Sequence, residues 1–343
     1  MSLREPLTWE ELVALEDTGD RWIVDGLIQK GSRMIIYGPP GLGKSLIALD
    51  LALSVATGTP FLGEHTPQAT GPVLVYSTEG DIMSNRDRLL MIANAHEAPE
   101  EIPLSFSQEA VLLDEESEAG SFFRILGRLQ PFLLILDPLD SFFWGEENSA
   151  TATKPIRHFL NRVVQEINPD NGGCAVVLLH HAAALSPEKG SPMKIRGSTA
   201  WHGWADTVLQ VCLDPRARDR KGLLLNVTKQ RNGPSGEFAR VTPRIQEAER
   251  LISFDVGPAE PFGMLASRIA ELLQDQYPLT VAGIRTAVGG HPTTIGAALK
   301  HLVKQGRIES APVSVPSGAG RSRTVTGWQL TGTSMPADDL EQS

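Results

Sequence analysis

The chain has 343 residues, 41% of them hydrophobic, and a formal net charge of −10 at pH 7. This length accommodates two domains, one of them large, with enough apolar residues for a sizeable core. The acidic balance excludes a generally basic, nucleic-acid-coating surface but is compatible with a local basic channel. No apolar run approaches the roughly 20 residues that span a bilayer, and the N-terminus is too polar for a signal peptide. A cytoplasmic protein without a membrane partner is expected.

The first 256 residues show the strand and helix pattern of an α/β domain. Residues 1–30 are expected to be a lead-in and interface segment, with a short helix around 9–15. Residues 31–256 then alternate apolar, strand-like runs with helical segments, which predicts a mostly parallel sheet between helices. The expected strands are short and apolar on both faces, and span 34–37, 73–77, 133–137, 175–179, 207–212 and 223–228. The two cysteines, Cys174 directly before the run 175–179 and Cys212 at the end of 207–212, are expected to be buried reduced thiols.

Residues 38–45 read GPPGLGKS and fit the phosphate-binding loop G-x-x-x-x-G-K-[ST], between an expected strand and an expected helix. Glycines let backbone N–H groups wrap a polyphosphate, and the following helix adds its positive N-terminal dipole. Lys44 is expected to contact the β- and γ-phosphates and Ser45 to ligate Mg²⁺. The sequence therefore predicts an ATPase that uses ATP and Mg²⁺, with a nucleotide-binding set of Gly38, Pro39, Pro40, Gly41, Leu42, Gly43, Lys44, Ser45 and Leu46.

Two expected strands lead into carboxylates suited to ATP hydrolysis. The run 133–136 ends in Asp137, the pattern in which an aspartate at a strand's carboxyl end supports the Mg²⁺ shell. Pro138 follows it, where many ATPases have a glutamate. Glu79, which follows the run 73–77, is therefore the candidate that polarises the attacking water, from a strand expected beside the phosphate loop. A solvated glutamate that opens a turn is the alternative.

Histidines and cations follow two later strands. His180 and His181 come after an apolar run, and adjacent strand residues point to opposite faces, so a γ-phosphate sensor is favoured over a metal pair. A structural histidine is the other alternative. Lys229 and Arg231, at i and i+2, project from the same side of the chain. Their expected target is a neighbouring subunit's nucleotide, as an arginine finger in trans; the alternative is a solvated basic turn.

A second, smaller domain is predicted over residues 257–332, after a Gly- and Pro-containing linker. Helices expected over 264–274, 281–288 and 293–305 precede a hairpin over 307–315 and 322–330, the layout of a winged helix-turn-helix. Nucleic-acid contact through the third helix or the wing, and a protein-interaction role, both stay open. Residues 333–343 form a tail expected to be disordered. The domain is locally basic, through Arg268, Arg285, Lys300, Lys304, Arg307, Arg321 and Arg323.

The combination resembles the RecA-type hexameric ATPases, and most closely the RepA-type replicative helicases of plasmids and mobile elements. The resemblance extends over about residues 20–232. It implies a RecA-like core that assembles into a ring, usually hexameric, with ATP at the subunit interfaces. The segments that carry it, besides the phosphate loop, are WIVDGLI at 22–28, YSTE at 76–79, DPL at 137–139, EEN at 146–148, HHA at 180–182 and RGSTA at 196–200.

The resemblance also implies roles for single residues. Lys44 and Ser45 would bind phosphate and Mg²⁺, Asp137 the metal shell, Glu79 the attacking water and His180 the γ-phosphate.

Two loops, about 142–154 and 183–196, would face the central channel. The second would grip a single-stranded DNA backbone through Lys189, Lys194 and Arg196.

The cations at 229 and 231 look like the Lys-x-Arg pair of related ring helicases. In the family, the arginine finger can lie just after the Arg-Gly-Ser segment, but residues 201–206 of this chain contain no arginine. The candidates for the arginine finger are therefore Arg196 and Arg231, and Arg231 is favoured.

Three functions remain open on the sequence alone. The leading one is a motor on single-stranded DNA, a replicative helicase of a plasmid, phage or mobile element. A recombination or repair ATPase, or a helicase loader, would share the same active site. An ATP-regulated, sequence-specific DNA-binding protein is the third. In an ATP-regulated DNA-binding protein, the smaller domain would bind duplex DNA. In a replicative helicase, it would bind duplex DNA or a replication protein.

Overall fold

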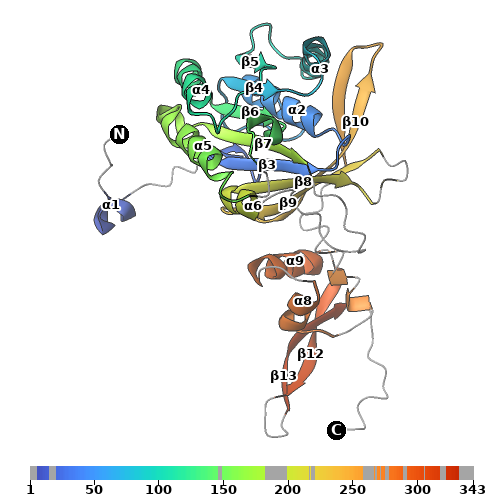
Figure 1. The fold of residues 1–343 in the computed structure, drawn as a ribbon. Helices are drawn as coiled ribbons and strands as arrows, with labels where there is room; N and C mark the ends of the chain where they lie inside the picture. Colours follow the sequence, from blue (N-terminus) through green and yellow to red (C-terminus); the bar gives the residue numbers. More distant parts are fainter. Residues whose placement is uncertain are drawn as a thin grey trace.

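The computed structural model describes residues 6–14, 21–145, 149–181, 199–215, 217, 221–257, 266, 269–270, 272–274, 278–288, 292–304, 306–316 and 322–331. A nine-stranded sheet organises the larger part, in the order β11-β10-β9-β8-β3-β7-β6-β4-β5 (Figure 1). Six neighbouring strands run parallel: β3 (Arg33–Gly38), β4 (Val73–Ser77), β5 (Leu104–Ser107), β6 (Leu133–Asp137), β7 (Ala175–His181) and β8 (Thr207–Leu213). The mixed α/β fold with a large, mostly parallel sheet is thereby confirmed.

Helices cover both faces of this sheet, because successive strand residues point to opposite sides. Met34 and Ile36 of β3 pack in the hydrophobic cluster that contains α2 (Lys44–Thr57) and α3 (Ile82–Ala95). Ile35 and Tyr37 pack in a second cluster with α4 (Glu116–Leu129), α5 (Lys154–Glu166) and α6 (Thr199–Trp204). Two short 3₁₀ helices, η1 (Leu139–Phe142) and η2 (Pro169–Asn171), complete the connections.

The last three strands of the sheet depart from the predicted alternation of strands and helices. β9 (Leu223–Gln230), β10 (Gly236–Gln246) and β11 (Leu251–Gly257) follow one another as an antiparallel meander, with β9 antiparallel to β8. The prediction of a parallel alternation up to residue 256 is therefore wrong beyond β8. Antiparallel strands can be joined by short turns, whereas parallel ones need a crossover, so no helix is required here.

The N-terminal residues form short elements. α1 (Trp9–Val13) begins with a capping box, in which Thr8 and Glu11 satisfy each other's backbone N–H groups. β1 (Trp22–Val24) pairs antiparallel with β2 (Ile28–Gln29). No helix in the described part of the chain is both long and apolar enough to cross a membrane.

The C-terminal residues build a module with its own hydrophobic core. α8 (Val281–Val288) and α9 (Pro292–Lys304) precede the antiparallel pair β12 (Ile308–Pro316) and β13 (Ser322–Leu330), and the described residues at 266, 269, 270 and 272–274 are helical. The order of elements is the expected one, while its assignment as a winged helix stays a prediction, as do the domain limits. The tail 333–343 lies outside the described residues. The core consists of Ala266, Ile269, Leu273, Ile284, Val288, Ile295, Ala298, Leu299, Leu302 and Ile308.

Candidate active site

The phosphate loop joins the carboxyl end of β3 to the first residue of α2, Lys44. Gly41 and Gly43 have φ angles of +76° and +74°, in the left-handed region that side chains disfavour. At Gly38 a Cβ atom would lie 2.2 Å from the carbonyl oxygen of Val211 on β8, so the neighbouring strand leaves no room for a side chain. Three of the motif's glycines therefore have a structural reason that does not depend on a ligand.

The side chain of Lys44 is folded back onto the phosphate loop. Its Nζ donates to the carbonyl oxygen of Pro39 at 2.9 Å, and the residue is buried. Burial lowers the pKa of this ammonium, while the negative charges of Glu79 and Asp137 oppose that effect. The cation is thus held within the loop and near both predicted carboxylates, where a polyphosphate would replace the Pro39 carbonyl as its partner.

Asp137 ends β6 and is 5% exposed. Burial raises the pKa of its carboxyl to about 6, although a hydrogen bond from Ser45 opposes the shift. Ser77 Oγ lies 3.5 Å from its Oδ2, and the Thr78 backbone N–H donates to its carbonyl oxygen at 2.9 Å, which ties the ends of β4 and β6 together. Mg²⁺ prefers hard oxygen ligands and retains several waters. A desolvated carboxylate beside the Ser45 hydroxyl fits that ion.

Glu79 follows β4, which is not beside the phosphate-loop strand as predicted, because β7 and β6 lie between β3 and β4. The prediction overlooked that strands consecutive in the chain need not be neighbours in the sheet. The carboxylate still acts electrostatically on Lys44 and Asp137. Asn85 Nδ2 donates to the backbone oxygen of Glu79 at 2.9 Å, so the backbone is fixed while the side chain stays half exposed.

His181 is the histidine that lies near this carboxylate, whereas His180 is the one predicted as the γ-phosphate sensor. His181 Nε2 lies 3.7 Å from Glu79 Oε1. In the pairing of β7 with β3, His181 is opposite Gly38, the first residue of the phosphate loop. His180 points to the other face, is 2% exposed, and has its Nδ1 3.1 Å from its neighbour's carbonyl oxygen. The alternation of a strand that continues through both histidines was the signal that could have found His181.

Lys229 and Arg231 lie at the opposite edge of the sheet from the phosphate loop of the same chain. β9 runs antiparallel to β8, so its carboxyl end meets the amino ends of β8 and β3. The Arg231 backbone N–H donates to the Asp206 carbonyl oxygen at 3.1 Å. The Asp206 backbone N–H in turn donates to the carbonyl oxygen of Arg33, the first residue of β3. These cations are not part of the cluster around Lys44.

The predicted DNA contacts Lys189, Lys194 and Arg196 lie outside the described residues. Of the other predicted channel loop, residues 142–145 and 149–154 are described. There the side chain of Trp144 is 78% exposed while Phe142 and Phe143 are buried beside it. The sequence analysis did not single out this indole.

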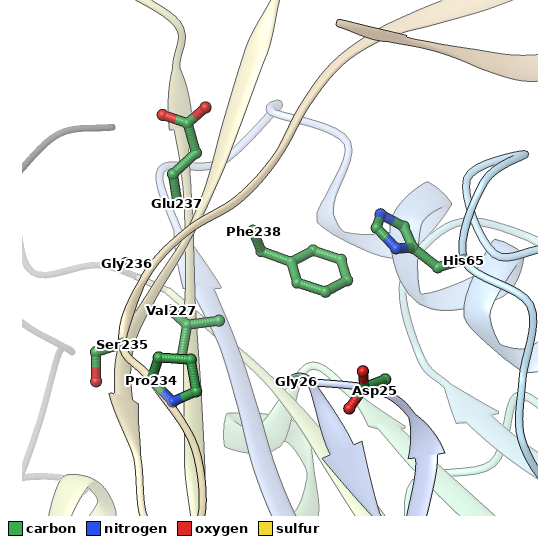
Figure 2. A pocket seen from close by; sticks show the side chains of 9 residues that line it. All are labelled: Asp25, Gly26, His65, Val227, Pro234, Ser235, Gly236, Glu237 and Phe238. Carbon is green, nitrogen blue, oxygen red and sulfur yellow. The ribbon is translucent and has the colours of Figure 1, made fainter. Parts of the chain in front are cut away.

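A separate hollow of about 260 Å³ lies beside the turn between β9 and β10 (Figure 2). Figure 2 shows the ring of Phe238 next to that of His65, whose centroids are 4.5 Å apart. Asp25 and Gly26, from the turn between β1 and β2, line the other side. None of the predicted catalytic residues lines this hollow.

Of the comparisons with known proteins, the match to a family model shows what kind of domain the chain contains. No curated protein matches the sequence. Among solved structures, the one titled "ATPase Domain of G40P" is 16% identical, covers 65% of this chain and 85% of its own, and has a TM-score of 0.46. The model of the AAA domain family AAA_25 matches residues 2–186, more than half of the chain and including the phosphate loop, Glu79, Asp137 and both histidines. The chain therefore belongs to this AAA domain family of P-loop ATPases.

Proposed function

We propose that the chain is a RecA-like motor ATPase that assembles into a ring and acts on single-stranded DNA, as a replicative helicase of a plasmid, phage or mobile element. The observation that carries the proposal is the placement of Glu79 and His181, 3.7 Å apart, at the edge of the sheet where the phosphate loop lies. In this pair, the carboxylate of Glu79 can activate a water for hydrolysis, and the imidazole of His181 can respond to the position of that carboxylate.

The residues act on the nucleotide in distinct ways. The phosphate loop binds the polyphosphate through its backbone N–H groups, and Lys44 turns from Pro39 towards the terminal phosphates. Ser45 and Asp137 would hold Mg²⁺, which, when bound, neutralises charge on the phosphates. Glu79 accepts a proton from the attacking water, a role worth about 10²–10⁴ in rate. The contact between His181 and Glu79 would change according to whether the Glu79 carboxylate faces water or phosphate.

Completion of the site requires a second copy of the chain. Arg231 lies at the far edge of its own sheet, so it can serve only a nucleotide bound to a neighbour. Such a finger supplies about 10³–10⁵ in rate. This supports an oligomer, and a ring is the closed arrangement in which every subunit both gives and receives an arginine.

The C-terminal module is proposed to be a winged helix-turn-helix. Its hydrophobic core is its own, and Lys300, Arg285 and Arg307 are exposed cations on or beside its helices. Exposed cations on or beside a helix suit phosphate contact on duplex DNA. Duplex binding that is lost on deletion of residues 258–343, with ATP hydrolysis retained, is the expected result.

The experiment that tests the main proposal is steady-state ATP hydrolysis with Mg²⁺, with and without single-stranded DNA, with Lys44→Ala as the inactive control. Stimulation of severalfold or more, followed by unwinding of a forked duplex, is expected. A slow rate that DNA does not change, together with sequence-specific duplex binding, would favour the regulatory DNA-binding function instead.

A further inference from the structure

The two cations of the Lys-x-Arg pair do different things in the structure. Lys229 Nζ donates to three backbone carbonyls, those of His202 at 2.6 Å, Gly203 at 3.3 Å and Ala205 at 2.6 Å. An ammonium group has three donors, so these contacts use all of them. Lys229 is therefore fully engaged within its own chain.

The three carbonyls lie at the C-terminal end of α6. The last carbonyl groups of a helix have no intrahelical partner, and they carry the negative end of the helix dipole. A cation beside these carbonyls donates hydrogen bonds to them and is attracted by the negative end of the dipole. Trp201 and Trp204 of this short helix are buried in the second hydrophobic cluster, and Trp204 Nε1 donates to Asn161 Oδ1 at 2.8 Å. Lys229 thus ties the end of α6 to β9.

Arg231 is engaged less completely. Its Nη2 donates to the Gly203 carbonyl oxygen at 2.9 Å, and its Nη1 lies 3.3 Å from Asp206 Oδ1. Arg33 already holds Asp206, with Nε and Nη2 each 2.8 Å from its two carboxylate oxygens. One carboxylate therefore serves two guanidinium groups. The Arg231 side chain is 48% exposed, so it can turn towards an outside anion without leaving Asp206 unpaired.

We infer that the pair is divided: Lys229 is a positioning residue that holds the C-terminal end of α6, and Arg231 is the cation available to a phosphate of a neighbouring copy. The second half rests on the proposed function, whereas the first does not. A shift of the Arg231 side chain would break its hydrogen bond to the Gly203 carbonyl oxygen, which lies in α6.

Hydrogen exchange of the whole protein tests the clamp directly. In Lys229→Met the amides of residues 202–206 are expected to exchange roughly tenfold faster or more, because hydrogen bonds to a charged group are lost. Lys229→Arg, which keeps the cation, should restore most of the protection. Lys300→Met, at an exposed lysine of α9, is the matched control. Unchanged exchange at 202–206 in Lys229→Met would overturn the clamp.

Mixing experiments test the division of roles. Each variant, Lys229→Met or Arg231→Ala, is mixed with Lys44→Ala, and ATP turnover is measured. Arg231→Ala should recover turnover in the mixture, because Lys44→Ala subunits supply an intact arginine to its nucleotides. Turnover by Lys229→Met should not recover beyond the average of the two proteins, since its defect lies within its own chain. Equal recovery by both would show that Lys229 also reaches the neighbour. A wild-type protein without DNA-stimulated turnover would refute the proposed function and leave the exchange result to decide the clamp.

Discussion

In the proposed function, Glu79 and Lys44 have separate tasks: Glu79 would activate the attacking water, and Lys44 would bind the phosphates. The half-exposed carboxylate of Glu79 contacts no backbone N–H of the phosphate loop in the described structure, whereas Lys44 is buried within it. Removal of the carboxylate's charge should therefore affect hydrolysis far more than nucleotide binding.

Glu79→Gln is expected to lower kcat for ATP by about 10²–10⁴ while the Kd for ATP changes little. The measurement pairs steady-state hydrolysis with equilibrium binding of a fluorescent ATP analogue. Glu100→Gln, at an exposed glutamate outside the site, is the matched control. Tight binding together with unchanged turnover would show that another carboxylate activates the water.

Neither cysteine should react readily in the folded protein. Burial raises the pKa of the Cys212 thiol to about 11 and that of Cys174 further still. At pH 8 the protonated form then dominates, with about one thiolate per thousand molecules at Cys212, and the thiolate is the form that is alkylated. Iodoacetamide at pH 8 should label both thiols slowly until denaturant is added. Cys174 is buried, whereas Cys212 is only partly buried and not fully buried as expected. Fast labelling of both thiols in the native protein would contradict this placement.

The phosphate-loop strand depends on contacts with its neighbours. β3 is paired on one side with β7 and on the other with β8, and the approach of β8 at Val211 is what excludes a side chain from position 38. This close contact joins β3 to β8, the last parallel strand before the antiparallel meander. A glycine there is needed for packing as well as for phosphate binding.

Gly38→Ala is expected to destabilise the protein by about 1–3 kcal/mol, because β3 and β8 must move apart to accept the methyl group. Thermal unfolding without nucleotide measures this. Gly120→Ala is the control, since Gly120 lies in α4 with nothing within 4 Å of its Cβ position. That change should stabilise by roughly 0.5–1 kcal/mol. A similar Tm for both variants would show that β8 is not tightly packed against position 38.

The sequence predicted best those elements whose signal is local. β4, β6 and β13 have the expected limits, because apolar runs or turn residues bound them on both sides. β5, β10 and β11 were missed, since they mix polar and apolar residues and carry no run of Val, Ile and Leu. The order of strands in the sheet is a long-range property, and this is why Glu79 was placed two strands too close to the phosphate-loop strand. The choice between His180 and His181 depended on where β7 ends, and strand ends are weakly encoded.

Assembly of the whole molecule is tested by mixing inactive variants. Neither Lys44→Ala nor Arg231→Ala should turn over ATP well alone, because each removes one half of a shared site. An equimolar mixture should regain a fraction of wild-type turnover, since some interfaces then pair an intact phosphate loop with an intact arginine. The readout is steady-state hydrolysis after subunit exchange, compared with either protein at the same total concentration. A mixture no better than its parts would argue against Arg231 as the shared group.

The position of the phosphate loop and of Arg231 at opposite edges of one sheet has a consequence for how activity responds to dilution. The strand between them, β3, is six residues long. At a rise of about 3.3 Å per residue, the two edges are roughly 20 Å apart. An isolated chain would bind ATP yet leave it nearly intact. Turnover per chain would then rise steeply with protein concentration near the dissociation constant of the assembly. The amount of protein in the cell would thereby control activity, since monomers would hydrolyse almost no ATP and only assembled chains would be active.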